Sequence, residues 1–280
     1  MTEEYHDWEA QQDSLADKNR ESLVSTAWKY FTSRMSESTG FVSSTDSFPF
    51  ATLWDISSQI LAMHSARELE IISRSWFDCH VQKILQSMVK MPLLVNDGAL
   101  LPNRLYSVDS LDPADDTGAI GRYCGWSSTD IGVFLETKKV LSEACPYLRS
   151  SLEDVTSRWD IEHAVVEGVI QGFRKTTTGV VGEGGEKFDE DKYPYGTLSA
   201  KGFELEGLSV RAPRQPSHST VVHGETVPWD EYGMTTLEPF VYEEIFARRG
   251  LGRWLIAGSL RSMLNVQLKH FLASGAFTCA

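Results

Sequence analysis

Three segments of the sequence place a tryptophan on or close to an aspartate: Trp54-Asp55, Trp126 with Asp130, and Trp229-Asp230. An indole face stacks on the apolar face of a sugar ring, and a carboxylate binds hydroxyl groups or transfers a proton. The pairing is therefore typical of a carbohydrate site. An aspartate also caps helix starts, and Trp159-Asp160 repeats the dipeptide inside a predicted helix, so a capping or packing role stays open.

The acidic members of these segments are candidates for acid–base chemistry. Hydrolysis of a glycosidic bond uses two flanking carboxylates, roughly 5–5.5 Å apart for retention and roughly 6.5–9.5 Å apart for inversion. Asp55, Asp130, Asp230 and Glu238 are the candidates. We predict Asp55, Asp130 and Glu238 as catalytic. Glu238 is the preferred general acid or base, because it stands at a predicted helix start beside aromatic residues, where a capping role is again the alternative.

Other polar and aromatic side chains in loops are predicted to bind substrate. The full predicted binding set is Trp54, Asn103, Arg104, Tyr106, Trp126, Tyr195, Lys201, Trp229 and Asp230. For Arg104 an ion pair within a structured loop is the alternative. For Tyr195 the alternative is that its ring covers a short helix.

Other reaction classes find little support in the sequence. It has no Gly-x-Ser-x-Gly elbow and no phosphate-binding Gly-x-x-x-x-Gly-Lys-Ser/Thr loop. The segment Gly182–Gly185 is too acidic to hold phosphate, and the widely separated cysteines have no zinc-type spacing. We therefore predict no metal and no cofactor.

The elements that must position these residues are mainly helices. Apolar residues at a 3.6-residue period or helix-start signals predict helices over residues 17–34, from 53, over 66–88, from 127 or 128, from 146, and over 198–208, 238–248 and 252–273. A strand is predicted at 93–95 and a small β-hairpin at 169–181, a surface loop at 182–196, and a long irregular excursion at 209–232. Long loops that alternate with helix pairs favour a mainly α, (α/α)-toroid-like domain over a plain bundle.

Composition limits the partners. The 280 residues carry a formal charge of −13, which disfavours nucleic acids and anionic lipids but not neutral sugars. No stretch of ~18 apolar residues predicts a membrane span, and the polar N-terminus is unlike a signal peptide. We expect a polar extension over 1–16, one domain over 17–280, and a protein that is cytoplasmic or trimmed from an exported chain. The oligomeric state is left open.

A set of short motifs in one order resembles a bacterial family known as domain of unknown function 3131. The motifs are Ala27–Phe31, Thr39–Val42, Thr52–Asp55, Leu101–Tyr106, Gly125–Gly132, Ser199–Phe203 and Thr236–Phe240. The resemblance implies an (α/α)-toroid like that of glucoamylase-type proteins and a role on bacterial glucans or exopolysaccharides. It also implies a cleft lined by Trp54, Asp55, Asn103, Trp126, Asp130, Lys201 and Glu238. Such proteins usually continue beyond the position of Phe277–Ala280, so an incomplete toroid is one expectation.

Three functional hypotheses follow. The first is a glycoside hydrolase or transglycosylase acting on an oligo- or polysaccharide. The second is a non-catalytic glycan-binding module with the same residues. The third is a helical scaffold for protein interactions, which would have no affinity for sugars.

Overall fold

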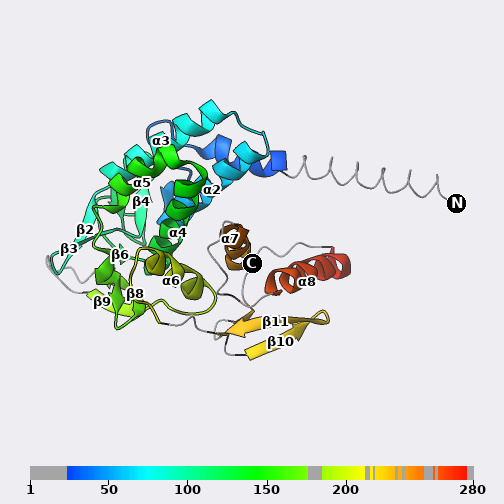
Figure 1. The fold of residues 1–280 in the computed structure, drawn as a ribbon. Coiled ribbons are helices and arrows are strands. Elements are labelled where there is room, and N and C mark those ends of the chain that lie inside the picture. Colours follow the sequence, from blue (N-terminus) through cyan, green and yellow to red (C-terminus); the bar gives the residue numbers. More distant parts are fainter. Residues whose placement is uncertain are drawn as a thin grey trace.

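The computed structural model describes residues 24–175, 185–211, 215–216, 218–230, 233–234, 237–248, 255 and 258–275. The predicted N-terminal extension lies outside this part of the chain. Helices dominate the described part: residues 24–34, α2 (Leu53–Glu68), α3 (Arg74–Lys90), α4 (Ser128–Ala144), α5 (Arg149–Thr156), α6 (Tyr195–Leu205), α7 (Glu238–Arg248) and α8 (Ser259–Ser274). Figure 1 shows them following one another along an arc, with α7 on its inner side.

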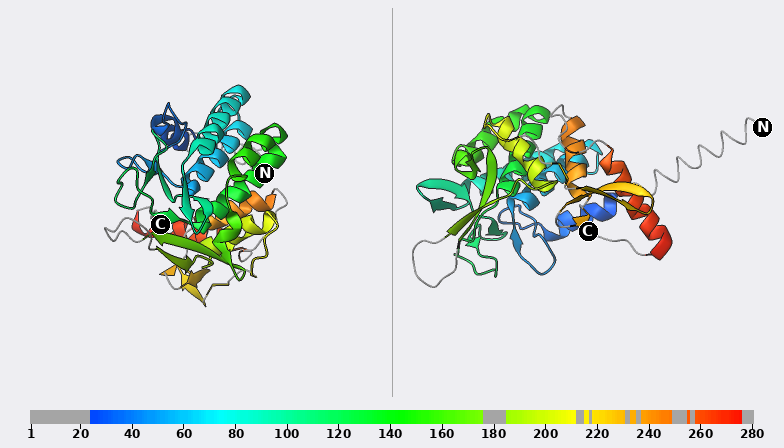
Figure 2. Two further views of the ribbon diagram at one scale, coloured as in Figure 1. Left: turned by 90° about the vertical axis from the view of Figure 1, so that its left-hand side faces the viewer. Right: turned by 90° about the horizontal axis from the view of Figure 1, so that it is seen from below.

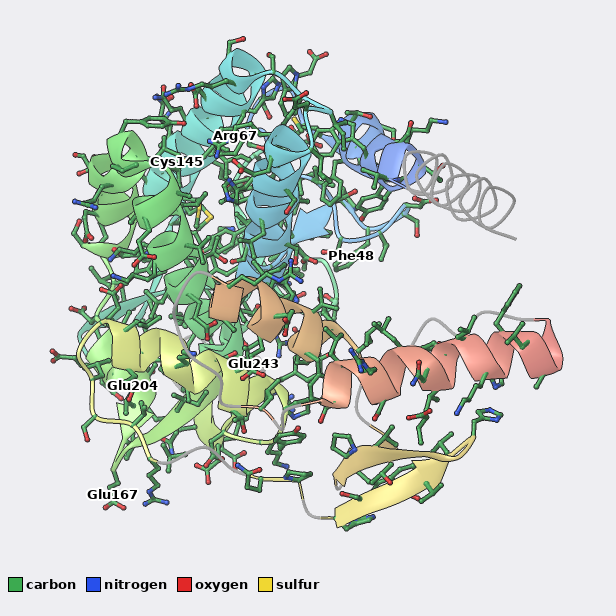
Figure 3. All side chains as sticks on the ribbon, turned by 45° about the vertical axis from the view of Figure 1, so that its right-hand side comes forward. Phe48, Arg67, Cys145, Glu167, Glu204 and Glu243 are labelled. Carbon is green, nitrogen blue, oxygen red and sulfur yellow. The ribbon has the colours of Figure 1, made fainter. Side chains whose placement is uncertain are left out.

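Helices α2 and α4 run parallel, with their starts at one end. At that end, the charge of Asp55 in α2 acts on Asp130 in α4. At the other end, Arg67 near the end of α2 donates to the Cys145 sulfur just after α4, at 2.9 Å, and Figure 3 labels both residues. The proximity of the two starts and the bond between the two ends show that the packed helices run in the same direction.

Helices α6 and α7 start at this same end. The ring of Trp54 in α2 lies 5.2 Å from that of Tyr195, the first residue of α6. Trp54 also bonds Glu238, the first residue of α7, and one turn later Ser58 bonds Tyr242. Because both contacts advance by four residues, α2 and α7 are parallel. We call the shared end of α2, α4, α6 and α7 the helix-start end.

Two glycines allow α4 and α6 to approach to backbone contact. A Cβ atom on Gly132 would lie 2.2 Å from the carbonyl oxygen of Ser199, and one on Gly202 would lie 2.0 Å from that of Gly132. Any larger residue would force the helices apart. The crossing lies about one turn from both helix starts and therefore sets the spacing of the side chains there.

Local capping explains where two of these helices begin. Thr52 and Asp55 form a reciprocal capping box at the start of α2. The Ser127 side chain accepts from the Asp130 backbone N–H at the start of α4. The sequence prediction of both starts is confirmed, as are the bounds of α7.

The core lies mainly among α2, α3, α4 and α5. Its largest fully buried side chains include Phe77 of α3 and Phe134 of α4. A second cluster joins the facing sides of α2, α4, α6 and α7 and includes Leu61, Val133, Leu198 and Phe246. Thus α7 fills the space between the other three helices with apolar side chains.

Short antiparallel strands occupy the connections. They form the sheets β1-β4-β5 (Phe50–Ala51, Leu105–Ser107, Pro113–Ala114), β2-β3 (Leu93–Asn96, Ala99–Pro102), β6-β8-β7 (Gly125–Trp126, Val169–Lys175, Val165–Val166) with β9 (Gly185–Asp189) paired to β8, and β10-β11-β12 (His218–Val222, Glu225–Asp230, Gly233–Met234). The right-hand view of Figure 2 shows α8 alongside the β10–β11 ribbon, in agreement with the packing of Met263 and Val266 near Val227.

The sequence prediction was wrong on two points of this architecture. The helix expected over 66–88 is divided: α2 continues to Glu68, Glu70 adopts a left-handed conformation, and Ser73 caps a new helix through the Trp76 N–H. Strand content was underestimated: residues 185–189, expected as loop, form β9, and the stretch 209–232, expected to be irregular, contains β10 and β11. Within the described residues, no helix combines the length and apolar character needed to cross a membrane.

Candidate functional site

Glu238 lies at the centre of an aromatic and polar arrangement at the helix-start end. Its Oε1 accepts a hydrogen bond from the indole Nε1 of Trp54 at 2.8 Å, and its Oε2 accepts one from the hydroxyl of Tyr195 at 3.3 Å. Glu238 is exposed, whereas Trp54 and Tyr195 are half-buried. The carboxylate is therefore held at the surface by two donors from two other helices.

Tyr242 forms the inner side of this arrangement. Its ring meets that of Trp54 edge-on at 5.4 Å, and its hydroxyl forms a hydrogen bond with Ser58. Burial raises the pKa of Tyr242, and the charges of Glu238 and Asp55 raise it further. Both carboxylates are thus near one phenol, although they come from helices that are far apart in the sequence.

Asp55 serves as a cap for α2 at the edge of this site. Its Oδ2 accepts hydrogen bonds from Ser44 Oγ at 2.6 Å, from Thr52 N at 2.8 Å and from Thr52 Oγ1 at 2.9 Å. Three donors on one oxygen fix the side chain firmly. The capping role weighed for this residue is therefore present, and its charge still reaches the site.

Asp130 differs from Asp55 in its surroundings. It is half-buried, and its Oδ1 accepts a hydrogen bond from Ser127 Oγ at 3.0 Å. Burial and then the charge of Glu190 raise the pKa of Asp130 to about 7, with a smaller contribution from Asp55; Ser127 and Arg104 act in the opposite direction. A carboxyl group with this pKa can hold a proton near neutral pH and release it.

Glu190 is the neighbour that sequence reasoning missed. It follows β9, and its Oε2 accepts from the backbone N–H and the hydroxyl of Ser128 and from the Thr129 N–H at 3.2 Å. It therefore caps α4 from another part of the chain. Gly172 leaves room for it, since a Cβ there would lie 2.7 Å from the Glu190 Cδ. The acidic run Asp189–Asp191 before Tyr193 was the only signal in the sequence. We refer to Asp55, Asp130, Glu190 and Glu238 as the carboxylate cluster.

Three residues predicted to bind substrate lie in the interior. Asn103, Tyr106 and Trp126 are each at most 1% exposed. Asn103 bonds the backbone of Leu105 and Cys124 at 2.8 and 2.9 Å, which secures the strands that lead to α4. The Tyr106 hydroxyl donates to the Pro92 carbonyl, and the Trp126 indole donates to the Gln171 carbonyl. In these positions the three side chains support the loops behind the cluster.

Arg104 and Lys201 are both engaged with carboxylates. Arg104 forms an ion pair with Asp116, the alternative weighed for it, and its charge also reaches Asp130. Lys201 is 3% exposed and lies with Glu136 and Glu243, which are 0% and 4% exposed. Burial lowers the pKa of Lys201, against the effect of the two glutamates, and burial raises the pKa of Glu136. We call Glu136, Lys201 and Glu243 the buried ionic cluster; Figure 3 labels Glu243 between α7 and α6.

The third tryptophan–aspartate pair belongs to a different part of the molecule. Trp229 lies in β11, which packs on α8, and its ring is 6.2 Å from that of His218. The backbone of Asp230 pairs with Gly233, while its side chain lies outside the described part of the structure. The structure thus joins Trp54 and Tyr195 to Glu238, and it places Asp55 near Asp130.

A groove between α2 and α7 opens beside the cluster. Its volume is about 450 Å³, and Glu238 lines one part of it. The other lining residues are Ser58, Leu61, Ala62, Ser65, Leu237, Val241, Tyr242 and Ile245. We call it the apolar groove. In the described part of the chain, no group of three or more His, Cys, Asp or Glu side chains is arranged to hold a metal ion.

Comparison of the sequence with known families identifies the family of this chain. The model of the family described as protein of unknown function DUF3131 matches residues 22–280. The chain belongs to this family. No curated protein is significantly similar to it. Among solved structures, the "putative glucoamylase from Bacteroides fragilis" has a similar fold, with a TM-score of 0.58 and 9% sequence identity over 91% of this chain and 67% of that one. The DUF3131 chain therefore has a glucoamylase-like fold.

Proposed function

We propose that this DUF3131 protein is a carbohydrate-active protein that cleaves or transfers glycosidic bonds in a glucan or exopolysaccharide at the carboxylate cluster. The observation that carries the proposal is that Trp54 bonds Glu238 at the helix-start end of a glucoamylase-like fold, where Asp55 acts by charge on both Tyr242 and Asp130. A sugar ring needs an aromatic surface and acidic groups on either side of the bond. Trp54 supplies the aromatic surface, and Asp130 and Glu238 are the proposed acidic pair.

The surroundings of the carboxylates suggest different roles. Asp130, with a pKa of about 7, is the proposed proton donor to the leaving oxygen. Glu238, an acceptor for Trp54 and Tyr195, is the proposed partner that activates water or stabilises positive charge at the anomeric carbon. Asp55 and Glu190 act on Asp130 by charge while they cap α2 and α4. The sequence predicted Glu238 as general acid or base; we propose the second of these roles for it and the role of acid for Asp130.

The proposal is tested by measuring reducing ends released from a panel of linear glucans, one for each linkage. Removing a general acid or base lowers the rate by about 10²- to 10⁴-fold, so Asp130→Asn and Glu238→Gln should each lose that much activity. Asp154→Asn on the exposed side of α5 and Glu186→Gln in β9 are matched controls that should retain it. Unchanged cleavage by both site variants would refute the assigned roles.

A non-catalytic glycan-binding site is the second candidate, and the capping roles of Asp55 and Glu190 favour it. Asp55 Oδ2 and Glu190 Oε2 each accept hydrogen bonds from backbone N–H groups at helix starts. This candidate predicts oligosaccharide binding that depends on Trp54, with no product from any glucan after long incubation. Calorimetric titration beside the reducing-end assay separates the two.

A further inference from the structure

The apolar groove begins at a member of the carboxylate cluster. Glu238 lines it and also bonds Trp54, so the groove and the proposed sugar position share one residue. A molecule with its sugar at Trp54 and Glu238 can therefore continue directly into the groove. The groove follows α2 from Ser58 to Ser65, a length of about 10 Å at the rise of an α-helix.

The lining of the groove is mainly apolar along its whole length. The polar groups near Glu238 are Ser58 and Tyr242, whose hydroxyls bond each other, and Ser58 also donates to the Trp54 carbonyl at 2.9 Å. Apart from Ser65 at the far end, the other lining residues are the apolar Leu61, Ala62, Leu237, Val241 and Ile245. A sugar ring would lose its bonds to water there without replacing them, which is costly. A hydrocarbon chain gains by leaving water.

We infer that the apolar groove binds the alkyl or acyl chain of a glycolipid whose sugar lies at the carboxylate cluster. The inference rests on the proposed function, because that function places the sugar. The volume of about 450 Å³ falls within the usual range of small-molecule sites. Glu238 at one end disfavours a negatively charged head group, so the amphiphile that fits has a neutral sugar head.

Binding of hexyl, octyl and decyl glucoside, measured by calorimetry below their micelle-forming concentrations, tests the inference. Each buried methylene raises affinity up to about fourfold, and about twofold where the groove leaves part of it exposed. Affinity should therefore rise by about two- to fourfold per methylene. Decanoate, which has an alkyl chain of similar length and a carboxylate head, should bind at least tenfold more weakly than decyl glucoside.

Two variants that fill the groove make the test specific. Ala62→Phe and Val241→Trp should remove the dependence on chain length and leave cleavage of alkyl-free glucans within about twofold. Val221→Trp adds the same indole at an exposed valine in β10 and should bind decyl glucoside like the unmodified protein. Two positions on two helices protect against a fold defect in either one.

The outcomes separate this inference from the proposed function. Glucan cleavage with equal affinity for hexyl and decyl glucoside would overturn the groove assignment and leave the enzyme intact. Chain-length-dependent binding that Ala62→Phe abolishes, without cleavage of any glucan, would support an amphiphile site and remove the enzymatic role. Equal binding of decanoate and decyl glucoside would overturn the preference for a sugar head.

Discussion

The carboxylate cluster and the buried ionic cluster take acids from the same two helices, α4 and α7, but differ in their surroundings. Asp130 and Glu136 are both in α4, and Glu238 and Glu243 are both in α7. At the helix starts the acids meet solvent, aromatic rings and hydrogen-bond donors. Less than two turns farther along, Glu136 and Glu243 are buried near Lys201. The position along the helix, not the residue type, separates the acids that reach the helix-start end from the acids that are buried beside Lys201.

The largest expected effect comes from removing the cation of the buried ionic cluster. Lys201→Met removes the cation that is buried near Glu136 and Glu243, so we expect a loss of about 3–5 kcal/mol in the free energy of unfolding. Urea denaturation at pH 7 measures it. Lys139→Met, at a half-exposed pair with Glu143 on α4, is the control and should change stability by less than about 1 kcal/mol. Equal effects would show that the buried cluster does not join the helices.

The next largest effect comes from the close approach of α4 and α6 at Gly132. Gly132→Ala places a Cβ 2.2 Å from the Ser199 carbonyl and should cost about 1–3 kcal/mol of stability. Moving α4 from α6 also shifts Asp130 relative to Tyr195, so oligosaccharide affinity should fall in the variant that remains folded. Denaturation and calorimetric titration measure the two effects. Unchanged stability would contradict the close helix crossing.

The third effect concerns the pH dependence of stability. This dependence has one sign for an acid whose pKa is raised on folding and the opposite sign for an acid whose pKa is lowered. Because the folded pKa of Glu136 lies above its unfolded value near 4.3, the folded state is most favoured at low pH and loses stability as pH rises beyond that value. Glu136→Gln should remove this loss, so its advantage over the unmodified protein grows with pH. Denaturation from pH 4 to 8 tests the sign. A constant difference across that range would count against a raised pKa.

The smallest expected effect concerns the open cluster. Tyr195→Phe removes the 3.3 Å hydrogen bond to Glu238 and should lower catalytic efficiency by about two- to tenfold, which corresponds to roughly 0.5–1.5 kcal/mol. Tyr147→Phe removes a tyrosine hydroxyl bonded to Asp78, in α3, and serves as the control, with no expected change in rate. Comparable losses in the two variants would indicate that the Tyr195 hydroxyl has no special role.

Sequence reasoning recovered the elements that carry strong local signals. The capping residues Thr52 and Ser127 located the starts of α2 and α4, and Glu238 before Pro239 located α7. It did not detect the turn at Glu70, because Leu69 and Ile72 continue the apolar pattern through it. Strand β9 was missed since its pairing partner, β8, supplies the signal that its own charged sequence lacks.

The site was harder to predict than the fold. Trp54, Tyr195 and Glu238 are in direct contact as predicted site residues, but Trp126 has the same kind of sequence surroundings as Trp54 and is buried against Phe173. Lys201 was predicted to bind substrate but is buried, and Glu190 was not predicted at all. Both errors have the same cause. Which side chain meets a distant helix depends on helix crossings, such as that at Gly132, and no local pattern encodes them.

The proposed function depends most strongly on the protonation of Asp130. Carboxyl ¹³C resonances of the folded protein, with Asp130→Asn to assign the signal, give its midpoint with and without a glucan oligosaccharide. We expect a midpoint near pH 7 that shifts when the oligosaccharide binds, because the sugar displaces water beside the proposed proton donor. A midpoint near 4, the usual value for aspartate, together with no response to any oligosaccharide, would contradict it.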